Sequence, residues 1–292
     1  MASLIGNFLV AVVKFFAAAV TGSAAMTSEG IHSIVDTGNQ VLILYGLRQA
    51  AKPPSKEYPF GRGRELYFWS FVVAISIFAI GALVSLGEGV HRLMEPSVIT
   101  NPMVNYIVLA LAMVFEGYAW KVAYNKFRQS MGKKGFMKAL RDHKDPAVFL
   151  VLFEDSAALV GLAIAALGIA LTQATGILYF DGIAALLIGV VLAITAFFLA
   201  RETKSLLIGE SADPEIVQGI KELAMTFRSV ESVNDVLTMQ LGANDVLVNL
   251  SIEFRDEEST GTLEATIAAL VKAIKARFPD VKRVFVEAAD HK

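Results

Sequence analysis

Hydrophobic residues in this chain gather in long runs that short polar stretches separate. Six runs are long enough for a helix to cross the hydrocarbon core of a bilayer, which takes about 20 residues. These runs cover residues 4–26, 28–48, 67–90, 103–123, 146–172 and 180–200. We therefore expect an α-helical membrane protein with six transmembrane helices and a lipid bilayer as its surroundings.

The pattern changes after residue 208, where shorter segments with one apolar face replace the long runs. The expected elements are a helix from Asp213-Pro214 to about Phe227, a hairpin turn at 242–245, a strand over 246–254, a helix over 263–278 and a strand over 281–286. With one further strand before the turn, the order is αββαβ. The sequence thus predicts a transmembrane domain over 1–208 and a small cytoplasmic α+β domain over 209–292. A domain of this size gains stability by packing on a second copy.

Lysine and arginine are concentrated in two connections, after the second run and after the fourth. On the opposite side of the expected bundle we find only Arg92. Because cytoplasmic loops carry the excess of basic residues, we expect both termini in the cytoplasm of a bacterium with the protein in its inner membrane, or in the matrix of an organelle. The first run is rich in alanine, as signal peptides are, but removing it would place the two basic connections on inconsistent sides.

The composition excludes several classes of protein. With 55% hydrophobic and 18% charged residues, the chain differs from ordinary soluble proteins. Residues 209–292 hold nine Lys and Arg against fifteen Asp and Glu, and this acidic balance argues against a nucleic-acid partner. Cysteine is absent, so neither disulfides nor thiolate metal ligands are available. We find no nucleophile–base constellation and no phosphate-binding glycine loop, so we expect neither an enzyme nor an ATP-driven pump.

Ionisable side chains interrupt two of the apolar runs: Glu29, His32 and Asp36 in the second, Glu154 and Asp155 in the fifth. Charges are costly in hydrocarbon and usually mark an ion or substrate path. Helical residues three and four apart share a face, so the three in the second run lie on one side. An imidazole and a carboxylate so placed can bind a divalent cation, although the same pair could also serve only to bond neighbouring helices.

Glu154 and Asp155 diverge by about 100° on a helix, so one of them can face the second run while the other faces a third helix or a cavity. Asp145-Pro146 is expected to cap the start of this helix, which puts Asp155 about 14 Å from its cytoplasmic end. Asp36 lies at a comparable depth from the other side. We therefore expect carboxylates of two helices at one level near the middle of the membrane.

Several motifs resemble those of one family: Gly22-Ser23-Ala24-Ala25, Glu29-Gly30-Ile31-His32-Ser33-Ile34-Val35-Asp36, Pro59-Phe60-Gly61-Arg62-Gly63-Arg64-Glu65 and Phe153-Glu154-Asp155-Ser156-Ala157-Ala158. With six expected spans and an αββαβ tail, essentially the whole chain resembles the cation diffusion facilitator (zinc transporter) family. Phe115-Glu116-Gly117 and Asp36-Thr37-Gly38-Asn39-Gln40 are most similar to the subgroup of the mitochondrial zinc transporter and its bacterial relatives. The resemblance implies a homodimer that exports Zn²⁺ from the cytoplasm in exchange for protons.

The resemblance also implies the metal ligands. The family's transport site joins two residues of the second span to two of the fifth, and these map onto His32, Asp36, Val151 and Asp155. The family has a histidine at the position of Val151, and valine cannot bind a metal. Three mapped ligands remain, although zinc prefers four. The candidates for the missing ligand are a water and the carboxylates of Glu154, Glu29 and Glu116. An oxygen-rich set of this kind also suits Mn²⁺, Fe²⁺ or Co²⁺ as cargo.

The sequence therefore predicts a proton-coupled antiporter for a divalent metal cation. The alternative is a membrane-anchored dimeric sensor or scaffold protein without transport activity, in which the charged core only holds the bundle together. Proton movement that depends on the metal in sealed vesicles would separate the two, because a scaffold would show none.

Overall fold

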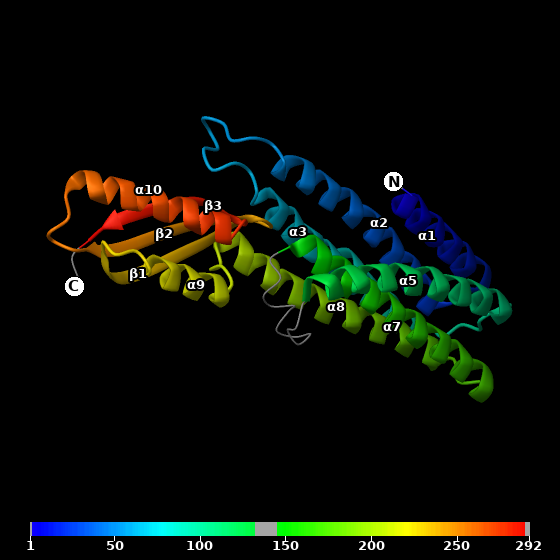
Figure 1. Cartoon of the computed structure of the whole chain (residues 1–292). Coiled ribbons are helices and arrows are strands. Elements are labelled where there is room, and N and C mark those ends of the chain that lie inside the picture. The colour runs from blue at the N-terminus through cyan, green and yellow to red at the C-terminus, as the bar shows by residue number, and fades with distance from the viewer. Residues whose placement is uncertain (1, 132–144, 290–292) are drawn as a thin grey trace.

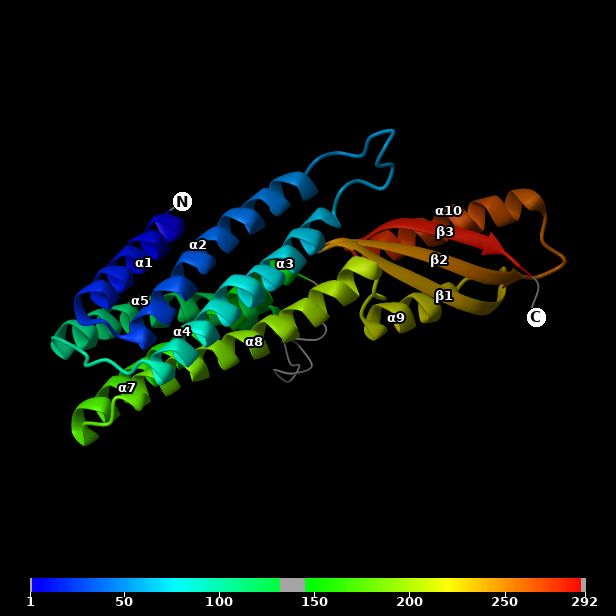
Figure 2. The same cartoon turned by 180° about the vertical axis from the view of Figure 1, so that it is seen from behind.

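The computed structural model describes residues 2–131 and 145–289 of the chain. The molecule is elongated, with a bundle of long helices at one end and a small domain of strands and helices at the other (Figure 1). The view from behind shows the same division (Figure 2). The last long helix, α8 (Tyr179–Ile208), leads from the bundle into the small domain.

The bundle consists of α1 (Ala2–Thr21), α2 (Ala24–Ala50), α3 (Glu65–Ser76), η1 (Ile77–Ala82), α4 (Leu83–Met94), α5 (Pro102–Met131), α7 (Pro146–Thr175) and α8. The π-helical segment η1 continues α3 into α4, so these three elements form one rod. The side chains of Ser23 and Asp145 cap the starts of α2 and α7, and the second of these caps was predicted from the sequence. Five of the basic residues expected between α5 and α7 lie outside the described residues: Lys133, Lys134, Lys138, Arg141 and Lys144.

Within the described residues, the helical stretches long and apolar enough to cross a membrane are Leu4–Thr21, Glu65–Met94, Pro102–Gln129, Pro146–Thr175 and Tyr179–Ile208. α2 falls short of this measure because its sequence includes several polar residues, among them Glu29, His32 and Asp36. It packs against α1, α3, α4, α7 and α8, so its polar face is covered by other helices instead of lipid. α2 thus takes the place of the sixth span, and the predicted fold class is confirmed.

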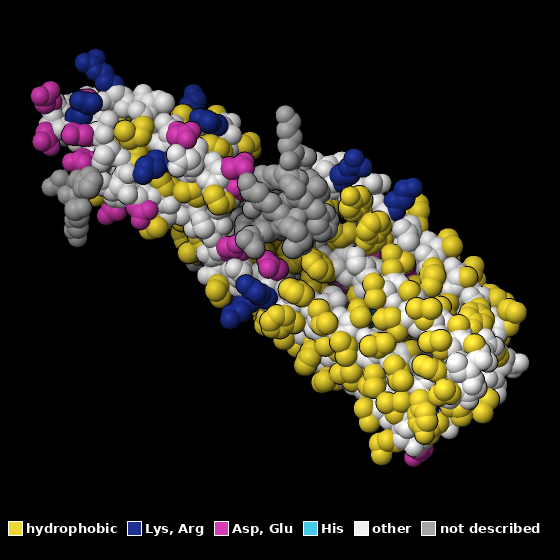
Figure 3. Space-filling model, turned by 90° about the horizontal axis from the view of Figure 1, so that it is seen from below, with side chains coloured by type: hydrophobic (Ala, Val, Ile, Leu, Met, Phe, Trp, Pro, Cys, Tyr) yellow, Lys and Arg dark blue, Asp and Glu magenta, His cyan; other side chains and the backbone are white. Residues whose placement is uncertain are grey.

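The outer surface of the bundle is apolar. Phe16, Val114 and Phe197 are 63%, 71% and 65% exposed, and large apolar residues recur on the outward faces of the bundle helices. Hydrophobic side chains dominate the helical end in Figure 3, whereas charged side chains are scattered over the other end. Proteins in water seldom expose apolar area on this scale, so the surface is one that lipid covers.

Glycines allow α4 and α8 to pack closely. A Cβ atom on Gly89 would lie 2.7 Å from Leu186, and one on Gly189 would lie 2.8 Å from Leu86. Each helix therefore places a leucine over a glycine of the other. Small residues at such contacts are typical of helices that associate in membranes, where packing replaces the hydrophobic effect.

The small domain follows the predicted αββαβ order: α9 (Pro214–Ala224), β1 (Val230–Gly242), β2 (Asp245–Phe254), α10 (Thr260–Arg277) and β3 (Val281–Ala288). The sheet order is β1-β2-β3, with β1 and β2 antiparallel and β2 and β3 parallel. Val248 and Leu250 of β2 pack against Ile220 of α9 and Ile274 of α10 in a core separate from that of the bundle. The boundary at 208/209 itself stays a prediction.

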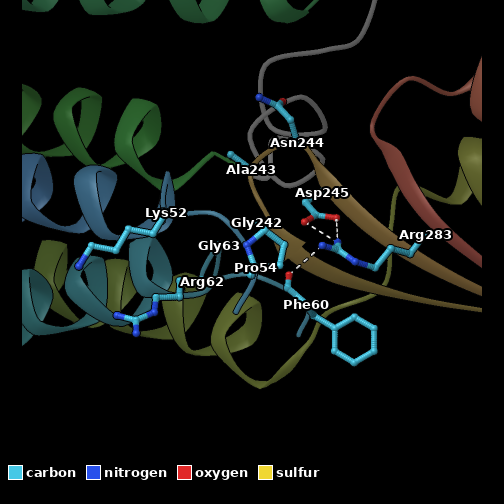
Figure 4. Close-up of a pocket in the computed structure, with 12 residues that line it drawn as sticks. Lys52, Pro54, Phe60, Arg62, Gly63, Gly242, Ala243, Asn244, Asp245 and Arg283 are labelled. Carbon is cyan, nitrogen blue, oxygen red and sulfur yellow. Dashed lines mark hydrogen bonds and ion pairs between the residues drawn. The ribbon is translucent and has the colours of Figure 1, made fainter. Parts of the chain in front are cut away.

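The small domain contacts the bundle through the connection between α2 and α3. One guanidinium nitrogen of Arg283 donates to both carboxylate oxygens of Asp245, at 2.6 and 2.7 Å, and the other donates to the carbonyl oxygen of Phe60 at 3.0 Å (Figure 4). Gly63 lies so close to the Leu241 carbonyl that a Cβ atom would not fit. The groove between this connection and the β1–β2 turn has a volume of about 250 Å³, and the polar residues of α2 and α7 do not line it.

The glycine contacts between α4 and α8 give a first prediction. Gly89→Ala should lower the free energy of unfolding by about 1–3 kcal/mol, because the added methyl group must displace Leu186. Gly87→Ala, on the same helix, is the matched control, since no atom lies within 4 Å of its added Cβ and alanine favours helix. Unfolding in detergent followed by circular dichroism compares the two. Equal stability of the two variants would contradict this packing.

Candidate metal site

α2 carries two buried side chains suited to a metal ion. His32 and Asp36 lie one turn apart on one face and are 2% and 7% exposed. His32 Nε2 and Asp36 Oδ2 are 3.5 Å apart, which is longer than a good hydrogen bond. Among the described residues, neither ring nitrogen of His32 nor Oδ1 of Asp36 has a hydrogen-bond partner. Buried polar atoms are nearly always paired in native proteins, so this face of α2 is equipped for a group that the chain itself does not supply.

α7 contributes two adjacent carboxylates to the same region. Glu154 faces α2, where its Oε1 accepts a hydrogen bond from Asn39 Nδ2 at 2.6 Å. Asp155 Oδ2 is buried and has no hydrogen-bond partner within the described ranges. α7 and α2, which carry these carboxyl groups and Asp36, contact each other directly. Glu154 is therefore the residue that makes a hydrogen bond to α2. The sequence alone left open whether Glu154 or Asp155 would face this helix.

The side of α7 that faces α5 is apolar where the family pattern places a histidine. Val151 is half-buried and packs against a cluster formed by Ala123, Phe127 and Leu152. One turn further along, Trp120 Nε1 donates a hydrogen bond to Ser156 Oγ at 2.9 Å and fixes α5 against α7. At this level α7 can therefore offer carboxylates to a metal but no imidazole.

The other two candidate carboxylates surround a buried lysine. Lys14 of α1 has no exposed area, and its Nζ lies 3.0 Å from Glu29 Oε2 and 4.0 Å from Glu116 Oε1. The same ammonium group donates to Ser33 Oγ at 2.7 Å. Glu29 and Glu116, which the sequence offered as possible ligands, thus lie next to the amino group of Lys14.

Asp181 of α8 has a structural role at the end of the bundle farthest from the small domain. Its carboxylate accepts hydrogen bonds from Ser23 Oγ at 2.5 Å and from the backbone nitrogens of Ala24 and Ala25 at 2.6 and 3.3 Å. Arg92 Nε lies 3.4 Å from the same carboxylate. These contacts hold the N-terminus of α2, where a negative charge is favourable. Asp181 therefore has its partners within the protein.

The predicted metal ligands lie in two separate halves of a site in this conformation, one on α2 and one on α7. No three His, Asp or Glu side chains within residues 2–131 and 145–289 lie close enough together to hold a metal ion. His32 and Asp36 make one half on α2, and Glu154 and Asp155 make the other on α7. A metal ion bound between them would need the two helices to close further, since ligand atoms of zinc lie about 2.0–2.2 Å from the ion.

Sequence reasoning missed the residue that connects the two halves. Asn39 lies seven residues after His32, which is two turns along the same face of α2, and that spacing is the signal that could have identified it. Its buried amide is bonded to Glu154 and leaves the second carboxylate oxygen of that residue for another partner. Asn39 therefore orients a candidate ligand without being one itself.

The chain as a whole is similar to several known proteins. Residues 1–208 match the family model described as the cation efflux transmembrane domain. The "Proton-coupled zinc antiporter SLC30A9, mitochondrial" of mouse and that of human are each 35% identical to this chain over 243 residues, or 82% of this chain and 43% of the relative. The "Manganese efflux system protein MneP" of Bacillus subtilis is 26% identical over 293 residues, or 97% of this chain and 92% of the relative.

The chain spans less than half the length of the SLC30A9 relatives it matches. Among solved structures, a MamM CTD in a cadmium form aligns with 27% of this chain and 98% of its own, at 16% sequence identity and a TM-score of 0.25.

The bond between Asn39 and Glu154 gives a second prediction. A double-mutant cycle with Asn39→Ala and Glu154→Ala should show a coupling free energy of about 1.5–3 kcal/mol, because the bond joins an amide to a buried carboxylate. Equilibrium unfolding in detergent measures the four proteins of the cycle without added metal. Strictly additive effects would show that the two side chains do not interact.

Proposed function

This chain belongs to the cation diffusion facilitator family of membrane metal transporters, and we propose that it exchanges Zn²⁺ for protons and exports the metal from the cytoplasm. One observation carries the proposal. Within the described residues, both ring nitrogens of His32, Oδ1 of Asp36 and Oδ2 of Asp155 are buried without a hydrogen-bond partner, on two helices that contact each other. Ionisable groups that are buried without partners in a membrane protein are more typical of a transport path than of a structural contact.

Four side chains are the proposed ligands: His32, Asp36, Asp155 and Glu154. They supply one imidazole and three carboxylates, which matches the number of ligands that zinc prefers. Glu154 takes the place of the histidine that Val151 replaces, and its bond to Asn39 fixes the orientation of its carboxylate. Glu29 and Glu116 are the weaker candidates, because they lie beside the ammonium group of Lys14, which occupies the space a metal ion would need.

The proposed ligands suit more than one divalent metal. One nitrogen and several oxygen ligands suit Zn²⁺ and also harder ions such as Mn²⁺, Fe²⁺ or Co²⁺. The names of the relatives point in both directions, since one is called a zinc antiporter and another a manganese efflux protein. We propose Zn²⁺ as the first substrate because imidazole is among its usual ligands.

Protons are the proposed counter-ion because metal and protons compete for the same atoms. A histidine or carboxylate must lose its proton before it binds a metal, so metal entry releases protons and protonation releases metal. A ring nitrogen of imidazole binds either a proton or a metal ion, so His32 can exchange one for the other. Closure of α7 onto α2 would assemble the site, and a rigid movement of the helices around it would change the side to which it opens.

We propose a homodimer with both termini in the cytoplasm. Arg48, Lys52, Arg62 and Arg64 lie at the end of the bundle next to the small domain, so the positive-inside bias places that domain in the cytoplasm. A bacterial inner membrane is the proposed location. Leu237 and Phe285 are 57% and 52% exposed and flank Asn249 on the face of the sheet that the helices do not cover, which makes this face suitable for a second copy.

The ligand assignment gives a third prediction. Asp155→Asn should reduce metal flux into proteoliposomes by about 100-fold or more while the dimer remains folded, because a neutral amide cannot replace a charged ligand. Glu88→Gln on α4 is the matched control, since Glu88 makes no ion pair with residues of the described ranges and should transport normally. Normal flux in Asp155→Asn would reject the site, and size-exclusion chromatography excludes misfolding.

Proton coupling gives a fourth prediction. Zn²⁺ uptake from the side of the small domain should accelerate when the vesicle interior is acidic, because protons inside discharge the metal from His32 and the carboxylates. The acceleration should disappear when an ionophore collapses the gradient. If Zn²⁺ uptake is independent of a proton gradient that is shown to persist, the protein is a uniporter. If there is no Zn²⁺ uptake at all, the sensor or scaffold hypothesis is the one that remains.

A further inference from the structure

The cluster around Lys14 has the composition of a cation-binding site. Its ammonium group lies 3.0 Å from Glu29 Oε2, 2.7 Å from Ser33 Oγ and 4.0 Å from Glu116 Oε1. All four side chains are buried, and they come from α1, α2 and α5. Two carboxylates and a hydroxyl around one positive charge are a set of oxygen ligands for a hard cation.

An unsatisfied atom shows that this cluster can accept more positive charge than it holds. Glu29 Oε1 is buried and has no hydrogen-bond partner among the described residues. It lies where a Cβ atom on residue 161 of α7 would be, so only the glycine found there leaves room for the carboxylate. One ammonium ion therefore balances two carboxylates, and one of their oxygens remains unpaired.

The cluster is close to the proposed transport site. Ser33 follows His32 directly in the chain, and Glu29 lies one turn before His32 on the side away from the small domain. An exported ion would pass this level after it leaves His32 and Asp36. Carboxylates without a counter-charge would attract it strongly there, since electrostatic interactions are enhanced in an apolar interior.

We propose that Glu29, Glu116 and Ser33 form a second cation site, that the ammonium group of Lys14 occupies it, and that the protomer thereby binds one metal ion fewer than its carboxylates could hold. Lys14 is thus a specificity-determining residue that keeps a second ion out of the exit side of the bundle. The part that concerns the exit rests on the proposed function, whereas the site itself does not.

Removal of the ammonium group should open the site to a divalent ion. We expect Lys14→Gln to bind one more Mn²⁺ per protomer than the unmodified protein, because Mn²⁺ favours oxygen ligands. Lys14→Gln/Glu29→Gln should return to the unmodified count, and Lys14→Arg, which keeps the charge, should not exceed it. Electron paramagnetic resonance of Mn²⁺ titrated into the purified full-length protein in detergent gives the number bound.

The test compares the number of Mn²⁺ ions bound by Lys14→Gln with the number bound by the unmodified protein. It therefore stays valid even if the proposed transport site binds no metal. Equal Mn²⁺ counts for Lys14→Gln and the unmodified protein would overturn the proposal. If Lys14→Gln folds only when Mn²⁺ is present during purification, the ion has replaced the ammonium group, as proposed. If it unfolds with and without Mn²⁺ while Lys14→Gln/Glu29→Gln folds, the cluster is only a structural ion pair and the proposal is wrong.

Discussion

The cost of burying charge in an apolar bundle determines how this protein is organised. Every ionisable group inside the membrane needs a partner, because neither water nor lipid can supply one there. α2 carries Glu29, His32 and Asp36, and other helices cover it on several sides, so its position in the bundle follows from its polar residues. The apolar outer faces of the surrounding helices then form the surface for lipid.

The environment of the buried polar groups differs between three levels of the bundle. At the far end, Asp181 is satisfied by backbone and side-chain donors and fixes the start of α2. At the next level, Lys14 supplies an internal counter-charge for Glu29. Around His32 and Asp36, buried polar atoms have no hydrogen-bond partner among the residues that the structure describes. This contrast supports our proposal that the third level holds the exchangeable ion, because Asp181 and Lys14 have hydrogen-bonding or charged partners at their own levels.

The sequence predicted most of the fold because the relevant signals are local. Apolar run length defines the spans, Asp145-Pro146 starts α7, and the alternation from 246 to 254 is that of β2. Spacing on α2 likewise placed His32 and Asp36 on one face. The contacts between helices could not be predicted in the same way, since the rotation of α7 about its axis depends on packing. The choice of Glu154 as the partner of Asn39 and the pairing of Lys14 with Glu29 therefore required the structure.

The central claim is that α2 and α7 together hold one metal ion through His32 and carboxylates. X-ray absorption spectroscopy of the purified protein loaded with one Zn²⁺ per protomer tests it directly, because the spectrum reports the atoms bound to the ion. The account predicts one imidazole nitrogen and only oxygen otherwise, at about 2.0–2.2 Å, with the imidazole signal lost in His32→Ala. A spectrum with two or more imidazoles, or one that His32→Ala leaves unchanged, would contradict it.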